Sequence, residues 1–121
     1  MALVLFVDDD LGSRVLYEKA CIMLGHKALL AESGKSGIEI AQSSHPDLIL
    51  LDLSLPDING FQVLEKIRED PDTTGIPVVI LSAGVSKQDP QTALASGANA
   101  YLNKPIGLND LQQAINRFAI H

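Results

Sequence analysis

The sequence predicts an α/β fold built on an open parallel sheet with helices on both faces. Two observations carry this prediction: five short apolar runs alternate with segments of helical spacing, and each run is apolar throughout rather than at every second position. Strands of this kind belong to a sheet that is covered on both sides by right-handed crossovers. A closed barrel needs about eight such units, so five units favour a doubly wound sheet. The expected strands are LVLFV at 3–7, ALLA at 28–31, LILL at 48–51, VVIL at 78–81 and AYL at 100–102.

Between these runs, the apolar residues recur at the spacing of an amphipathic helix. The first and the last helical segments show the pattern at Leu16, Ala20, Met23 and Leu24, and at Leu108, Leu111, Ile115 and Phe118. Helix starts are predicted where residues have the spacing of a capping box or where proline follows a capping residue. These positions are Ser36 with Glu39, Asn59 with Gln62, and Asp89 before Pro90.

Length and composition indicate one soluble domain over residues 1–121, since 46% of the residues are hydrophobic and 20% are charged. Nine Lys and Arg stand against fifteen Asp and Glu, and the formal net charge of -6 argues against direct binding to nucleic acid or insertion into a membrane. The single cysteine, Cys21, is expected in the core. The N-terminal apolar run ends at Val7, too short for a signal peptide, so a cytoplasmic location is expected.

Polar residues follow the predicted strands at the end where such sheets bind ligands. In a doubly wound sheet this crevice lies beyond the carboxyl ends of the strands. The residues at those ends are Asp8, Asp9 and Asp10 after the first strand, Asp52 after the third, Ser82 after the fourth, and Asn103, Lys104 and Pro105 after the fifth. The topology therefore predicts that most of the chemistry-bearing residues share one rim.

Several carboxylates on one rim repel one another unless a cation lies between them. Mg²⁺ takes one or two carboxylates and keeps room for water and phosphate oxygens, and Asp8, Asp9 and Asp52 fit such a site. Lys104 adds a positive charge and Ser82 a hydroxyl suited to a phosphoryl group. Asp52 is the better candidate nucleophile, because it stands alone at a strand end and a carboxylate can form an aspartyl phosphate.

Four segments resemble the receiver domain of bacterial two-component response regulators, of the kind found in chemotaxis regulators. They are VDDD at 7–10, LILLDLSLPDING at 48–60, IPVVILSAG at 76–84 and GANAYLNKPI at 97–106. Together, in order and at receiver spacing, they are a highly specific combination. The resemblance implies a flavodoxin-like (βα)5 sandwich with strand order 2-1-3-4-5, and a signalling domain that assists its own phosphorylation and dephosphorylation rather than an enzyme.

The resemblance also implies a role for each matching residue. Asp52 becomes the phosphoacceptor, Asp9 a direct Mg²⁺ ligand, and Asp8 a ligand mostly through water, with the backbone carbonyl of Ser54 as a further ligand. Ser82 and Tyr101 become the switch residues and Lys104 the phosphate partner, with a cis peptide before Pro105. The implied donor is a sensor histidine kinase or a phosphotransfer protein. The implied output is an unknown partner that binds the face of the fourth helix, fifth strand and fifth helix.

Two alternatives remain open from the sequence. VDDD also resembles the nucleophile motif of haloacid dehalogenase type phosphatases, which would make Asp8 the nucleophile of a hydrolase, with Asp10 beside it. That family expects an acidic pair near the fourth strand, where this chain has Ser82, Ala83 and Gly84. A receiver that only docks partners is the second alternative. Asp57 and Asn59 vary the turn after the third strand, and Gly107 loosens the entry to the last helix, but neither departure from the receiver pattern is expected to touch the chemistry.

Overall fold

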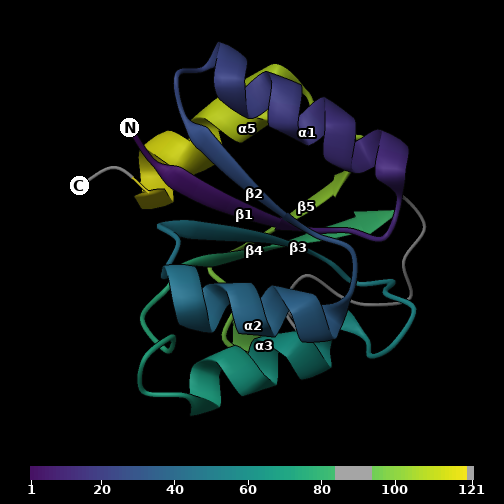
Figure 1. Cartoon of the computed structure of the whole chain (residues 1–121), viewed down its shortest axis with the longest axis vertical. Coiled ribbons are helices and arrows are strands. Elements are labelled where there is room, and N and C mark those ends of the chain that lie inside the picture. Colours follow the sequence, from purple (N-terminus) through teal and green to yellow (C-terminus); the bar gives the residue numbers. More distant parts are fainter. Residues whose placement is uncertain (84–93, 120–121) are drawn as a thin grey trace.

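The computed structural model describes residues 1–83 and 94–119. Five strands and four α-helices alternate along most of this chain, and the last helix continues as a π-helical turn (Figure 1). The elements are β1 (Leu3–Val7), α1 (Leu11–Met23), β2 (Lys27–Ala31), α2 (Gly34–Ser44), β3 (Leu48–Asp52), α3 (Gly60–Glu69), β4 (Val78–Ala83), β5 (Ala100–Lys104), α5 (Leu108–Ala114) and η1 (Ile115–Ala119).

The strands form one parallel sheet in the order β2-β1-β3-β4-β5, which confirms the predicted fold class and strand order. Three strands run further than predicted, because β3 includes Asp52, β4 includes Ser82 and Ala83, and β5 includes Lys104. Residues expected just beyond the strands are therefore held within the sheet ladder, where backbone hydrogen bonds fix their positions. The helix expected between β4 and β5, with its predicted start at Asp89 and Pro90, falls largely in residues 84–93, outside the described residues.

Helices cover both faces of the sheet (Figure 1), and each face carries its own hydrophobic core. Helices α2 and α3 cover one face, where Leu5, Val7, Ile49 and Leu51 are buried, and α1 and α5 cover the other. Burial on both faces explains why the strands are apolar at every position. The lone cysteine, Cys21, is fully buried against the α1 and α5 side, as predicted, and burial raises the pKa of its thiol to about 11.

The buried face of α1 agrees only in part with its apolar spacing, since Ala20 and Leu24 pack against the core. Tyr17 and Cys21 are buried, whereas Leu16 is 67% exposed and Met23 is 74% exposed. The helix carries apolar residues on both sides, so their spacing alone does not determine which side faces the sheet. The stacking of Tyr17 on Phe6, with ring centroids 5.1 Å apart, accompanies the observed orientation.

The helix starts follow the predictions in part. Asn59 caps α3 and forms the predicted box with Gln62. The predicted cap at Ser36 is wrong, because α2 begins earlier: Ser33 is the cap and Ser36 closes the box as its partner. At α5 the cap position is held by Gly107, whose N–H donates to Asp110 Oδ2 over 2.9 Å.

The predicted face of the last helix is largely confirmed. Leu111 and Ile115 are buried, but Leu108 at the first turn is 42% exposed. Within residues 1–83 and 94–119, no helix has both the length and the apolar character needed to cross a membrane.

Candidate functional site

Asp8 lies at the centre of a hydrogen-bonded cluster at the carboxyl end of the sheet. Its side chain is 1% exposed, and its carboxylate Oδ1 accepts the N–H of Asp10 over 2.9 Å. The backbone carbonyl of Asp8 accepts a hydrogen bond from Arg14 Nη1, also over 2.9 Å. Its own N–H donates to the carbonyl of Ala31, which extends the pairing of β1 with β2 by one residue. The position of this buried charge is therefore fixed from several directions.

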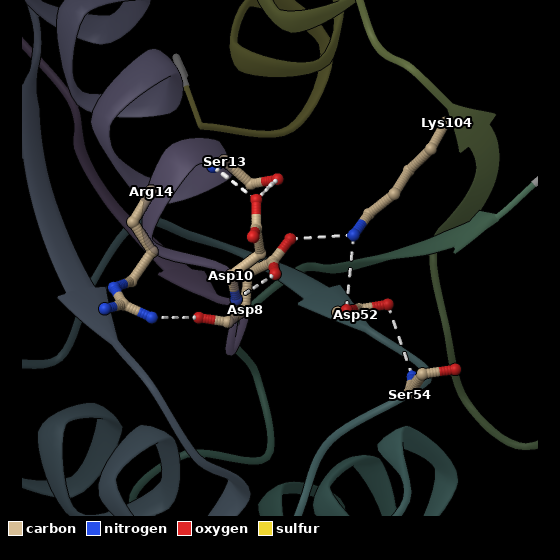
Figure 2. Close-up of polar contacts among 7 residues, drawn as sticks. All are labelled: Asp8, Asp10, Ser13, Arg14, Asp52, Ser54 and Lys104. Carbon is tan, nitrogen blue, oxygen red and sulfur yellow. Dashed lines mark hydrogen bonds and ion pairs between the residues drawn. The ribbon is translucent and has the colours of Figure 1, made fainter.

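Lys104 reaches across the sheet from β5 and joins two carboxylates (Figure 2). Its Nζ lies 2.7 Å from Asp8 Oδ2 and 3.2 Å from Asp52 Oδ2. The lysine side chain is 20% exposed, while those of the carboxylates are 1% and 7% exposed. Buried carboxylates require such a partner, because an isolated charge away from water is strongly unfavourable. The lysine, predicted as the partner of a phosphoryl group, thus pairs directly with these aspartates.

The surroundings raise the pKa of both Asp52 and Lys104. Burial raises the pKa of Asp52, although Lys104 and the N–H of Ser54 act to lower it. Burial acts to lower the pKa of Lys104, but the hydrogen bond to Asp8 and the charges of Asp52 and Asp8 together raise it. Lys104 is consequently a cation near neutral pH, and Asp52 holds its negative charge less readily than an exposed aspartate.

Three carboxylates converge closely enough to share a divalent cation. One oxygen from each of Asp8, Asp9 and Asp52 lies within 4.8 Å of the others, and Asp9 is exposed while its two partners are buried. Mg²⁺ binds oxygen at about 2.1 Å and retains water in its coordination shell. Oxygens at this separation suit a mixture of direct and water-mediated contacts. The donor set therefore fits Mg²⁺. The single ammonium group of Lys104 does not balance the three carboxylates, so the site keeps an excess of negative charge.

The backbone following Asp52 is folded tightly against it. The N–H of Ser54 donates to Asp52 Oδ1 over 3.2 Å (Figure 2), and the N–H of Gly60 donates to the carbonyl of Leu53 over 2.9 Å. A Cβ at Gly60 would lie 2.7 Å from the carbonyl oxygen of Asp52. Only glycine fits this approach without a shift of the backbone. The turn therefore lets α3 begin beside the carboxylate without covering it.

Asp10 has a structural role that separates it from the other two aspartates of the VDDD segment. Its Oδ2 accepts hydrogen bonds from the N–H and the hydroxyl of Ser13, each over 2.8 Å, and so caps α1 (Figure 2). The hydroxyl of Ser13, followed by its N–H, lowers the pKa of Asp10. This capping role is unfavourable for the phosphatase alternative, in which Asp10 would act beside Asp8.

The remaining predicted residues lie on β4 and β5. Ser82 is 2% exposed and pairs in register with Asn103, one residue beyond the pairing of Asp52 with Leu81. Tyr101 is half-buried on β5 and packs against the core on the α2 and α3 side. The peptide bond between Lys104 and Pro105 is cis, as the resemblance implies.

Two residues of the site region make hydrogen bonds that were not predicted from the sequence. Arg14 holds the backbone of Asp8, and Asp57 accepts hydrogen bonds from the N–H groups of Gly34 and Lys35, each over 2.9 Å. An arginine six residues after Asp8 carries a weak signal, since one helical turn brings it back toward the strand end. Asp57 carries none, because its partners lie more than twenty positions earlier in the chain.

Comparison with known proteins agrees with this arrangement. The sequence model of the response regulator receiver domain family matches residues 4–116. The chain therefore belongs to the receiver domain family of two-component systems, whose members are signalling domains rather than conventional enzymes.

Individual relatives support the assignment over nearly the whole chain. Protein PilH of Pseudomonas aeruginosa is 36% identical over 116 residues, which cover 96% of both chains. The chemotaxis protein CheY4 of Vibrio cholerae superimposes with a TM-score of 0.89 at 27% identity, covering 98% of each chain. The receiver domain of sensor histidine kinase PA1611 from P. aeruginosa, described with magnesium coordinated in its active site cleft, also has a TM-score of 0.89 at 27% identity, covering 98% of this chain and 97% of that one.

Proposed function

We propose that this chain is a single receiver domain, residues 1–121, that accepts a phosphoryl group on Asp52 in a Mg²⁺-dependent reaction. The donor would be a phosphohistidine of a sensor histidine kinase or a phosphotransfer protein, the partners with which receiver domains interact. The observation that supports this best is the grouping of three carboxylates around a buried strand end, with Lys104 Nζ 3.2 Å from Asp52.

The transfer would exchange one bond to phosphorus for another. A carboxylate oxygen of Asp52 attacks the phosphorus as the bond between phosphorus and the imidazole nitrogen breaks, and the electron pair of that bond stays on the nitrogen. Phosphoryl transfer needs positioning and charge stabilisation more than covalent assistance. Asp52 is held by β3 and by the N–H of Ser54. Lys104 is close enough to Asp52 to contact the phosphoryl oxygens and stabilise their negative charge.

Asp8, Asp9, Asp52 and the backbone carbonyl of Ser54 would hold Mg²⁺. When bound, the ion supplies positive charge between the carboxylates and the phosphoryl oxygens. The donor set fits the ion, and the PA1611 receiver domain, of the same fold, has magnesium in its active site cleft. Arg14 and the N–H of Asp10 keep Asp8 in place for this role.

Phosphorylation would change the conformation of the domain through Ser82 and Tyr101. An aspartyl phosphate carries more negative charge and more acceptor oxygens than a carboxylate, so Ser82 and Lys104 are drawn toward it. The movement of Ser82 makes space for Tyr101, which lies half-buried on the neighbouring strand. The face made by the fourth helix, β5 and α5 then changes, and a partner that prefers the changed face shifts the equilibrium by its differential affinity. The helix expected between β4 and β5, which would be part of this face, falls largely outside the described residues.

The partners proposed here are proteins in the cytoplasm. With a formal net charge of -6, the chain is unsuited to direct contact with nucleic acid. Loss of the phosphoryl group would occur at the same site, so the domain assists both its phosphorylation and its dephosphorylation.

Intact mass measurement after treatment with acetyl phosphate tests the proposal. The native chain should gain the mass of one phosphoryl group with Mg²⁺ and none with EDTA, and Asp52→Asn should gain none. Asp47→Asn is the matched control, since it makes the same chemical change at the opposite end of the sheet, and it should behave as the native chain does. An equal gain in the native chain and Asp52→Asn would overturn the assignment of Asp52.

A further inference from the structure

The loop of residues 53–59, here called the phosphoacceptor loop, joins Asp52 to α3 and is fastened at both ends by backbone hydrogen bonds. The N–H of Leu53 donates to the carbonyl of Leu81 over 3.1 Å, and the N–H of Gly60 donates to the carbonyl of Leu53 over 2.9 Å. Ser54 and Pro56 between them are exposed. Exposed loops are mobile unless their backbone is tied to a rigid element. The position of Ser54 therefore depends on the hydrogen bond from its own N–H to Asp52 and on what holds the middle of the loop.

Asp57 provides that tie. Its Oδ1 accepts the N–H of Gly34 and its Oδ2 accepts the N–H of Lys35, each over 2.9 Å. These are the first two residues of α2, whose N–H groups have no acceptor within the helix. In the described part of the chain, these two hydrogen bonds join the loop to a helix, and the N–H of Ser54, which donates to Asp52 Oδ1, joins it to β3.

The first turn of α2 is thus capped from two sources. Ser33, in its own chain segment, accepts the N–H of Ser36 over 3.1 Å, and Asp57 takes the two preceding N–H groups. A carboxylate is favoured at this end of a helix because the N-terminus carries partial positive charge. The hydrogen bonds from Lys35 and Gly34 lower the pKa of Asp57, so the carboxylate is ionised at neutral pH.

Packing beside Asp57 reinforces the connection. A Cβ at Gly34 would lie 2.5 Å from Cγ1 of Ile58 and 2.8 Å from Cγ2 of Val63. The helix and the loop therefore approach so closely that no side chain fits at Gly34. Helix α2 also packs against β1 and β2, which makes it a rigid support for the loop.

We infer that Asp57 is a positioning residue for the metal site: by fastening the phosphoacceptor loop to α2 it fixes the backbone of Ser54. The inference rests on the proposed function, in which the carbonyl of Ser54 faces Mg²⁺. Residues that orient metal ligands without touching the ion commonly change its affinity when they are replaced. Coupling of this kind is reciprocal, so Mg²⁺ binding strengthens the cap that Asp57 makes on α2.

Calorimetric titration of the full chain with Mg²⁺ tests the inference. Asp57→Ala should weaken Mg²⁺ binding by about tenfold, and Asp57→Asn, which keeps one acceptor oxygen, should fall between it and the native chain. Ser33→Ala is the matched control, because it removes a cap from the same helix end without touching the loop. It should bind Mg²⁺ as the native chain does while losing thermal stability.

Amide hydrogen exchange gives a second readout that does not depend on phosphorylation. Saturating Mg²⁺ should slow exchange at Gly34 and Lys35 in the native chain and in Ser33→Ala, but not in Asp57→Ala. Native affinity in both Asp57 variants would overturn the inference and leave the proposed function intact. Equal weakening in Ser33→Ala and Asp57→Ala would also overturn it, since a frayed helix end would then explain the loss. Absence of Mg²⁺ binding by the native chain would overturn the proposed function itself.

Discussion

The two ends of the parallel sheet hold similar polar side chains and use them differently. At the amino end, side chains complete the backbone of the strands: Asp47 accepts the N–H of Leu3 over 2.8 Å, and His26 Nδ1 accepts that of Ala2 over 2.9 Å. At the carboxyl end, Asp8 and Asp52 face each other across Lys104. Polar groups at the first end are satisfied by the fold, whereas those at the second retain an excess of negative charge that a cation can balance.

Replacement of the lysine at the carboxyl end is expected to have the largest effect. Lys104→Met removes the cation that would stabilise the transferring phosphoryl group, and loss of one such group slows a reaction about a hundredfold. The rate of phosphorylation by acetyl phosphate, followed by intact mass, measures this. Lys27→Met, at the first residue of β2 and exposed, is the control and should leave the rate unchanged. Similar rates in both variants would remove the distinction between the two ends.

Neutralising one carboxylate at each end should change stability in opposite directions. Burial raises the pKa of Asp52 above its ordinary value of 3.8, so the folded chain binds this proton more tightly than the unfolded chain. Ionised Asp52 therefore destabilises the fold above its raised pKa, and this penalty disappears once the pH falls below 3.8. In EDTA at pH 7, Asp52→Asn should raise the free energy of unfolding, and the gain should vanish in acid.

At the other end, Asp47→Ala removes the acceptor of the Leu3 N–H and should lower the free energy of unfolding by about 1 kcal/mol. Urea denaturation of both variants between acid and neutral pH measures the two effects. A loss of stability in Asp52→Asn at pH 7 would show that its pairing with Lys104 outweighs its burial.

Much of the fold could be predicted because its signals are local. Apolar runs on both faces identify the strands, and the order of strands and helices leaves few possible topologies. The orientation of α1 could not be predicted, since Leu16 and Met23 are as apolar as the residues that the helix buries. Tertiary contacts with Phe6 and α5 accompany the observed orientation, and neither has a local signature.

The candidate site shows the same division between local and distant signals. Asp8, Asp52 and Lys104 could be brought together from the sequence because each stands at a strand end and the topology joins those ends. Asp8 and Asp9 were assigned to the metal site from the sequence, whereas the capping of α1 by Asp10 depends on backbone direction and was not assigned. Asp57 was not expected to affect the site. The N–H groups that connect it to α2 belong to Gly34 and Lys35, which are distant in sequence.

The smallest expected effect is that of replacing His26, at the amino end of the sheet. His26→Ala removes the acceptor of the Ala2 N–H and should lower the free energy of unfolding by about 0.5 kcal/mol. Its affinity for Mg²⁺ in a calorimetric titration should equal that of the native chain. A weakened affinity would mean that the two ends of the sheet are energetically coupled.

Identification of the phosphorylated atom tests the central claim most directly. An aspartyl phosphate is reduced by borohydride to homoserine, which peptide mapping by mass spectrometry can locate after treatment with acetyl phosphate and Mg²⁺. The account predicts homoserine in place of Asp52 and at no other position. Homoserine in place of Asp8 would contradict it and support the phosphatase alternative.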